Sequence, residues 1–197
     1  MPVAPAAPDL ARRTVTLALV RDGEHYAEIV ERGVRRARAS VWIATANLKD
    51  VHVEARVGTR ARAARAFTSL FDELAEAATR GVEVRILYSG HASRPLAARM
   101  QKLGRSTIGL RCCGRSHLKM IAVDGQLLYL GSANFTGAGL GAKGDHRRNF
   151  EAGIVTDDDW VLDQMQATFD GIWRGQRCAG CRVRSECAQP LDRLGSR

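Results

Sequence analysis

The stretch from His117 to Asn134 restricts the fold of this chain more than any other part of the sequence. It reads HLKMIAVDGQLLYLGSAN, so that His117 and Lys119 alternate with apolar residues up to an Asp124-Gly125 pair. A period of two predicts a strand, and an aspartate–glycine pair is a strong signal for a tight hairpin turn. The stretch therefore predicts two antiparallel strands, with His117 and Lys119 on one face of the first.

The polar side chains of this hairpin suit a phosphate group. An imidazole such as that of His117 can attack phosphorus or move a proton, while the ammonium of Lys119 and the amide of Asn134 can hold non-bridging oxygens. Ser132 and Asn134 lie two residues apart, just past the returning strand. The sequence thus predicts a phosphate site. The other interpretation is an ordinary hairpin that carries polar residues by chance.

The spacing H-x-K-x4-D-x6-G-S-x-N resembles the HKD motif of the phospholipase D superfamily, and every motif position is matched here. The resemblance implies an α/β, phospholipase D-like fold in which helices flank a mixed central sheet. Two HKD motifs make one active site in that family, and this chain has one. Short members with one motif, such as the small bacterial endonucleases, act as homodimers. The resemblance therefore implies a homodimer with one half-site per chain.

The resemblance also implies roles for the motif residues. His117 of one subunit would form a phosphohistidine intermediate, and the second His117 would protonate the leaving oxygen and then activate water. Lys119 and Asn134 would bind the phosphate oxygens, Ser132 would add a hydroxyl donor, and Asp124 would hold the hairpin turn.

Glu151 lies in the apolar run NFEAGIV after the motif and matches the family carboxylate that orients the histidine. The other interpretation of Glu151 is a surface glutamate on a strand. The resemblance implies no cofactor for catalysis, because lysine and imidazolium supply the positive charge.

The chain as a whole predicts alternating strands and helices. We expect a flexible lead-in at 1–12, a catalytic domain at 13–174 and a basic, cysteine-bearing tail at 175–197. The arginine-rich stretch 47–62 predicts a loop that either lines the site or is merely mobile. Apolar periodicity predicts strands at 14–20, 41–46, 82–88, 107–111 and 149–155, and helices at 22–40, 63–80, 93–103 and 157–173.

The cysteines form a second pattern. Cys178, Cys181 and Cys187 follow a C-x2-C-x5-C spacing, and Cys112 or Cys113 could supply a fourth ligand. Such a set predicts a structural zinc ion or an iron–sulfur cluster, and the choice between them stays open. Unligated thiols in an irregular tail are the other interpretation.

Charge and hydropathy indicate the class of partner. The net charge of +9 comes mainly from arginine, whose paired donors suit phosphodiesters or anionic lipids, although it can also serve solubility alone. No apolar run is long enough to span a bilayer, and the first twenty residues do not resemble a signal peptide. We therefore expect a cytoplasmic protein with no membrane partner.

These observations predict a metal-independent phosphodiesterase that cleaves nucleic acid, with DNA favoured over RNA. A lipid phosphodiesterase or transphosphatidylase is one alternative, although no interfacial apolar surface is evident in the sequence. A non-catalytic subunit that only binds nucleic acid is another. The chain also resembles the phospholipase-D-like component of bacterial phage-defence systems, which works beside a helicase.

Overall fold

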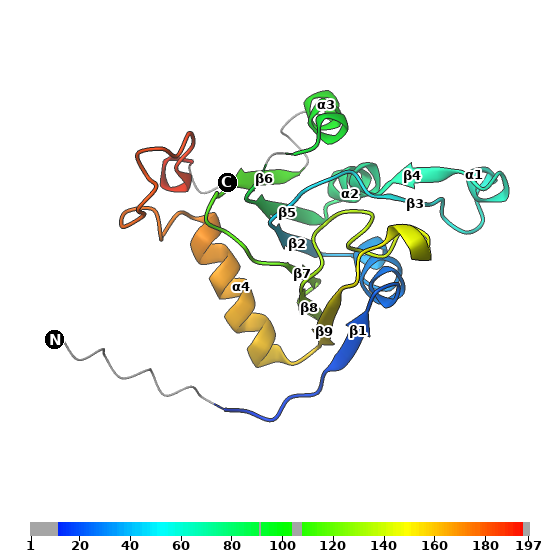
Figure 1. Ribbon diagram of the computed structural model, residues 1–197, viewed down its shortest axis with the longest axis horizontal. Helices are drawn as coiled ribbons and strands as arrows, with labels where there is room; N and C mark the ends of the chain where they lie inside the picture. Colours follow the sequence, from blue (N-terminus) through cyan, green and yellow to red (C-terminus); the bar gives the residue numbers. More distant parts are fainter. Residues whose placement is uncertain (1–11, 91, 104–107, 195–197) are drawn as a thin grey trace.

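A seven-stranded mixed sheet forms the centre of the protein in the computed structural model, which describes residues 12–90, 92–103 and 108–194 (Figure 1). Apart from Arg12, the predicted lead-in at 1–12 lies outside these described residues. The strand order is β1-β9-β8-β7-β2-β5-β6. The strands are β1 (Ala18–Arg21), β2 (Ser40–Thr45), β5 (Glu83–Tyr88), β6 (Gly109–Cys112), β7 (Met120–Val123), β8 (Leu127–Gly131) and β9 (Ala152–Thr156).

The pairing of the strands divides the sheet into two parts. Strands β2, β5 and β6 are parallel, whereas β1, β9, β8, β7 and β2 pair antiparallel in that order. Parallel strands need a crossover connection, and helix α2 (Leu70–Thr79) supplies one between β2 and β5. The predicted α/β class with a mixed central sheet is therefore confirmed.

One face of the sheet is covered by α2 and by a segment that the sequence predicts as one helix at 22–40. That prediction is wrong in detail, because the segment contains a short π-helix, η1 (Tyr26–Glu31), and a 3-10 turn, η2 (Val34–Arg36). At Gly33 a Cβ atom would lie 2.6 Å from the carbonyl oxygen of Ile29, so the tight bend there needs glycine. Helix α3 (Arg94–Leu103) follows β5.

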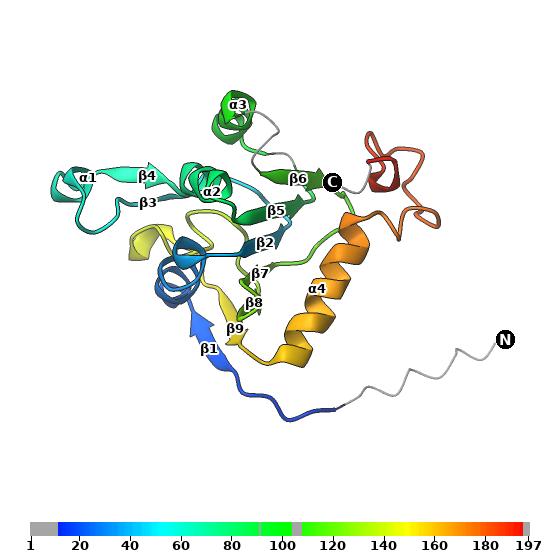
Figure 2. The ribbon, with the colours of Figure 1, turned by 180° about the vertical axis from the view of Figure 1, so that it is seen from behind.

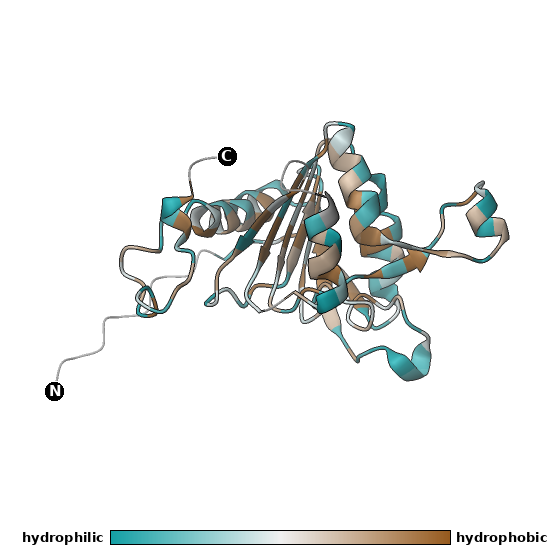
Figure 3. Cartoon of the chain, turned by 90° about the horizontal axis from the view of Figure 1, so that it is seen from above, coloured by the Kyte–Doolittle hydropathy of each residue, from teal (hydrophilic) through white to brown (hydrophobic). Residues whose placement is uncertain are grey.

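The opposite face is covered by α4 (Asp159–Trp173), and Figure 3 shows the sheet between these two helical layers. The side chain of Asp158 caps α4 by accepting a hydrogen bond from the backbone N–H of Val161. Phe169 and Trp173 of α4 are buried, and Phe169 stacks on Trp42 of β2 with ring centroids 5.3 Å apart. This packing fixes α4 over the middle of the sheet.

The chain after α4 runs back towards β6 and includes a 3-10 turn, η4 (Leu191–Arg193), as Figure 2 shows from behind. The guanidinium of Arg111, in β6, donates hydrogen bonds to the carbonyl oxygens of Trp173 and Leu194. These bonds connect the tail to the sheet. No helix among the described residues is long and apolar enough to cross a membrane.

The segment between β2 and α2 departs most from the sequence prediction. Residues 63–80 do not form one helix, because only the part from Leu70 onwards is α2. Before it, β3 (His52–Glu54) and β4 (Phe67–Ser69) pair as a two-stranded sheet, with a short helix α1 (Arg60–Ala63) between them. We call residues 52–69 the arm, which projects away from the central sheet (Figures 1 and 3).

Candidate active site

The candidate site lies at one edge of the central sheet, where four neighbouring strands begin or end. Met120 at the start of β7 pairs with both Ala44 near the end of β2 and Leu130 near the end of β8. Gly131 pairs in turn with Gly153 near the start of β9. Residues just beyond these strand ends must therefore lie at the same edge. They are His117, Lys119, Ser132, Asn134 and Glu151.

His117 and Lys119 lie before β7, because the regular strand begins at Met120 and not at His117 as the alternation predicts. The lysine still continues the hairpin, since its carbonyl oxygen accepts a hydrogen bond from the N–H of Gly131 at 3.3 Å. The Lys119 ammonium lies 3.1 Å from Nδ1 of His117 and 3.2 Å from its carbonyl oxygen. The ammonium also lies 3.4 Å from Nε2 of the same ring, so it is close to both ring nitrogens. The His117 side chain is exposed to solvent.

Asn134 is held by the end of β2. Its Oδ1 accepts hydrogen bonds from the backbone N–H groups of Ala46 and Asn47 at 3.1 and 3.0 Å, and lies 3.2 Å from the hydroxyl of Thr45. Two backbone donors fix the orientation of the amide, so its Nδ2 group faces away from them. That NH2 group is the part of Asn134 that is able to donate to a phosphate oxygen. Within the stretch 47–62, Asn47 is the residue that donates a hydrogen bond to Asn134.

Glu151 is held by neighbours from two other strands. Its Oε2 accepts a hydrogen bond from the hydroxyl of Ser132, and its Oε1 accepts one from the side chain of Asn149 at 3.0 Å. Its backbone N–H donates to Oδ1 of Asp22 at 2.9 Å. The hydrogen-bond partners of this carboxylate are thus Ser132 and Asn149 and do not include His117, which differs from the role that the resemblance implies.

Asp124 lies at the opposite end of the hairpin from the other motif residues, because the whole of β7 separates it from Lys119. Asp124 and Gly125 have positive φ angles of 55° and 65°, as a tight hairpin turn requires. The Asp124 carboxylate accepts hydrogen bonds from the backbone N–H groups of Arg38, Ala39 and Ser40 at 2.9, 2.7 and 2.8 Å. Partial burial opposes ionisation, but these three donors outweigh it and lower the pKa of Asp124.

A buried pair behind the site escaped the sequence prediction. His25 and Tyr129 are both fully buried, and Nε2 of His25 lies 3.1 Å from the Tyr129 hydroxyl. The same hydroxyl accepts a hydrogen bond from the backbone N–H of Ala133 at 3.0 Å. Burial raises the pKa of Tyr129 to about 12, so the phenol is neutral. Ala133 lies between Ser132 and Asn134, and the pair therefore holds the loop that carries both.

Position 131 of the motif requires glycine for a steric reason. A Cβ atom at position 131 would lie 2.7 Å from the carbonyl oxygen of Ala152 and would also overlap the Tyr129 hydroxyl. Any side chain there would push β8 away from β9 or displace the buried phenol. Gly131 thus allows the strand end, the phenol and the Ser132 loop to approach closely.

The predicted metal site is not supported. Cys112 is the last residue of β6, and burial, together with the nearby Cys113 and Cys187, raises the pKa of its thiol. Cys181 instead accepts a hydrogen bond from Arg115, which lowers the pKa of its thiol. All five cysteines are free and fall within the described residues, yet no three metal-ligating side chains there are arranged to hold an ion. The thiols are therefore divided between different partners.

Comparisons with known proteins agree with this fold and identify a family. A family model described as "Cardiolipin synthase, PLD-like domain" matches residues 30–173. No curated protein sequence matches the chain. Among solved structures, the chain is similar to Nuc from Salmonella typhimurium, a phospholipase D family member. The TM-score is 0.57 and the identity 20%, over 82% of this chain and 95% of that one.

Two further solved structures share the fold. NucT from Helicobacter pylori is 18% identical with a TM-score of 0.50, over 80% of this chain and 94% of that one. The phosphatidylserine synthase of Haemophilus influenzae is 14% identical with a TM-score of 0.53, over 78% of this chain and 36% of that one. Likenesses at this level of identity establish a common fold.

Proposed function

The chain belongs to the phospholipase D superfamily, as its HKD motif predicts, and we propose that it is a metal-independent phosphodiesterase that cleaves nucleic acid. The observation that carries the proposal is the gathering of His117, Lys119, Ser132, Asn134 and Glu151 at one sheet edge. These groups supply a nucleophile, donors for phosphate oxygens and a carboxylate. Asp124 has a structural role at the far end of the hairpin.

The proposed reaction has two steps. A ring nitrogen of His117 attacks phosphorus, the bond to the leaving oxygen breaks, and that oxygen takes a proton from the second His117. The second imidazole then removes a proton from water, whose oxygen attacks the phosphohistidine and releases the first imidazole. Lys119 and the Nδ2 group of Asn134 stabilise the charge on the non-bridging oxygens in both steps. No metal ion is needed for this charge balance.

The second His117 comes from a second copy of the chain in this proposal. One feature that supports such a dimer is an apolar surface beside the site. Leu19 and Ile154 pair across β1 and β9 on the face that α4 covers elsewhere, but Leu19 is 71% exposed. Phe150, two residues before β9, is 97% exposed. A C2 dimer through this surface would bury it and bring two equivalent sites together.

A lipid phosphodiesterase is the second candidate function. It is favoured by the same exposed residues, Leu19 and Phe150, because an apolar rim next to the site would also suit a lipid surface. The description of the matching family model names a lipid synthase. The excess of arginine favours nucleic acid instead. A cytoplasmic location and a helicase partner stay predictions from the sequence.

The test is an assay in EDTA with single-stranded DNA, duplex DNA, RNA and phosphatidylcholine vesicles as substrates. We expect turnover of nucleic acid that is insensitive to the chelator. His117→Ala should abolish this turnover and leave DNA retention nearly unchanged, because the imidazole acts on the phosphorus and not on the bulk of the substrate. His146→Ala, in the exposed 3-10 turn η3 (Asp145–Arg147), is the matched control and should keep its activity.

Turnover of the phosphatidylcholine vesicles, without turnover of any nucleic acid, would show that the protein is a lipid phosphodiesterase. If His117→Ala keeps full activity, the proposed nucleophile is wrong. DNA retention without turnover by the wild-type chain would indicate a subunit that binds nucleic acid without cutting it.

A further inference from the structure

The arm carries an excess of positively charged side chains. Its residues 52–69 contain four arginines, at 56, 60, 62 and 65, against a single acidic residue, Glu54. Arg62 pairs with Glu54, and Arg56 pairs with Glu73 of α2. Within the part of the chain that the structure describes, the side chains of Arg60 and Arg65 are exposed and form no ion pair. The tip of the arm therefore presents uncompensated cations to solvent.

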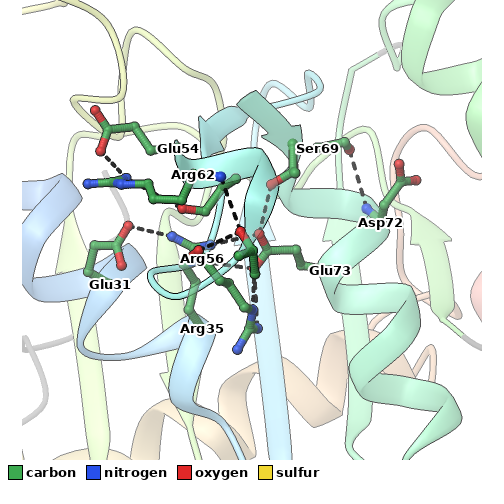
Figure 4. A network of polar contacts seen from close by, with 11 residues as sticks. Glu31, Arg35, Glu54, Arg56, Arg62, Ser69, Asp72 and Glu73 are labelled. Carbon is green, nitrogen blue, oxygen red and sulfur yellow. Dashed lines mark hydrogen bonds and ion pairs between the residues drawn. The ribbon is translucent and has the colours of Figure 1, made fainter. Parts of the chain in front are cut away.

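The root of the arm is anchored by a buried carboxylate, as Figure 4 shows. Both oxygens of Glu73 accept hydrogen bonds from the guanidinium of Arg35, at 2.8 and 2.9 Å, and both side chains are almost fully buried. Arg56 lies 3.2 Å from the same carboxylate, and the hydroxyl of Thr68 donates to it at 2.8 Å. Bidentate pairing of this kind fixes geometry as well as charge. The arm is thus held in one orientation relative to α2.

An open hollow of about 410 Å³ lies where the arm meets η1 and η2. Its lining includes Arg36 and Arg56 together with the carboxylates Glu31 and Glu54, which pair with Arg35 and Arg62. Arg36 is exposed and, like Arg60, has no ion-pair partner among the described residues. The unpaired cations, Arg36 beside the hollow and Arg60 and Arg65 on the projecting arm, form a track that suits a repeating polyanion better than a single small anion.

Apolar side chains accompany these cations. Val57 near the tip is 86% exposed, and Phe67 at the start of β4 is 60% exposed. Exposed aromatic rings beside arginines are the usual platform on which bases of single-stranded nucleic acid stack. An acidic protein partner would use the charges but would give no reason for an exposed phenylalanine among them.

The arm also begins near the candidate site. Asn47, whose N–H contacts Asn134, lies five residues before β3, and the backbone N–H of Lys49 donates to the carbonyl oxygen of Phe135. The segment that leads into the arm is therefore attached to the motif loop. A strand bound at the site could continue along this segment to the arm.

We infer that the arm is a docking surface for the backbone of a nucleic-acid strand, single-stranded in preference to duplex, whose scissile phosphate lies at the HKD edge. This inference rests on the proposed function for the position of the cut. The arm would hold the flanking nucleotides through Arg60, Arg65 and Phe67. Contacts of this type, with phosphates and with the face of a base, do not distinguish one base sequence from another.

The test measures binding and not turnover. Labelled single-stranded and duplex DNA are titrated with His117→Ala protein by fluorescence anisotropy at salt concentrations from about 50 to 200 mM. Adding Arg60→Ala and Arg65→Ala should weaken the binding of single-stranded DNA several-fold and reduce the salt slope by about 1.4, since each lost phosphate contact removes about 0.7. Adding Phe67→Ala instead should weaken binding but leave the salt slope unchanged.

The matched control is Arg182→Ala with Arg193→Ala, which removes the same charge from exposed positions on the tail. An equal loss in this control would mean that bulk charge, and not the arm, binds DNA, and an unchanged slope in the arm variant would overturn the inference directly. Sedimentation of each variant tests whether the arm instead contacts a second copy, which would also overturn it. Because the readout is retention by an inactive chain, failure of the proposed reaction would leave this result interpretable.

Discussion

Tyr129 connects the core of the protein to the loop that carries Ser132 and Asn134. Its hydroxyl is the common partner of the His25 ring and the Ala133 N–H, and both of these residues are buried. A buried donor left without a partner costs about 1–3 kcal/mol. The position of the loop therefore depends in part on an oxygen atom that has no role in the proposed reaction.

We expect Tyr129→Phe to lower the free energy of unfolding by about 1–3 kcal/mol, because the His25 ring and the Ala133 N–H lose their partner. Turnover should fall as well, since the loop that carries Ser132 and Asn134 would lose one of its contacts with the core. Urea unfolding and the nucleic-acid assay check the two effects. Tyr88→Phe is the control, because the Tyr88 hydroxyl makes no hydrogen bond within the described residues. Equal stability of Tyr129→Phe and wild type would contradict the role of the hydroxyl.

At the scale of the element, the β7–β8 hairpin is held at both ends by β2. Asn134 contacts the last residues of β2, while Asp124 accepts hydrogen bonds from the residues that begin it. The two motif residues therefore fix opposite ends of the same pair of elements. Only the Asn134 end faces the candidate site, which explains why Asp124 belongs to the motif without being near His117.

The lowered pKa of Asp124 predicts a pH-dependent contribution to stability. A carboxyl whose pKa is depressed on folding stabilises the protein fully above its unfolded pKa of about 3.8, and this contribution is lost as the pH falls through the folded value. Asp124→Ala should lower the free energy of unfolding by about 1–3 kcal/mol at neutral pH. The difference from wild type should shrink below about pH 4, and urea unfolding across this range measures it.

The control for this series is Asp157→Ala, at an exposed position before α4. It should follow the wild-type curve at every pH. A constant difference between Asp124→Ala and wild type from neutral to acidic pH would exclude the carboxylate as its source.

The elements that the sequence predicts well are those whose signals are local. The hairpin turn, β5 and α4 each follow from a short pattern, namely Asp124-Gly125, an apolar run, and the Asp158 cap before a helical stripe. The arm was missed because residues 47–62 show no period and predict a loop, while the part from 63 onwards is predicted as part of the helix that follows. Three-residue strands paired between His52 and Ser69, and a positive φ of 53° at Arg65, are found in place of this loop and the start of that helix.

Prediction of the candidate site from the sequence is also limited to local signals. Which residues belong to it follows from the motif, but how they are held depends on contacts between distant parts of the chain. The Tyr129–His25 contact joins positions 104 residues apart, and the buried Arg35–Glu73 pair joins positions 38 apart. The periodicity of a single sequence gives no signal for contacts between residues so far apart in the chain. The cysteine spacing misled for the same reason, because spacing alone does not show that Cys181 faces Arg115.

At the scale of the whole molecule, a site shared by two copies predicts how mixed samples behave. If each active site needs both His117 side chains, a dimer of one wild-type and one His117→Ala chain is inactive. Co-refolding equal amounts should then give about a quarter of the wild-type activity per total chain, because only one dimer in about four holds two intact chains. Turnover and sedimentation of the mixture measure this.

Mixing wild type with His146→Ala under the same conditions is the control and should keep full activity. Activity of about half in the His117→Ala mixture would show that each chain works independently. A monomeric protein at the assay concentration would likewise show that each chain works independently. The exposure of Leu19 and Phe150 would then not be explained by a dimer.

The pairing of β1 with β9 has a consequence for how the protein is made. Glu151 takes its backbone partner from Asp22, 129 residues earlier, and β1 has no other strand beside it in the sheet. A chain still emerging from the ribosome must therefore keep its first strand unpaired until most of the sequence has been synthesised. Glu151 therefore reaches Asp22 only late in synthesis, and a polypeptide that ends before β9 would not hold the edge of the sheet that carries the candidate site together.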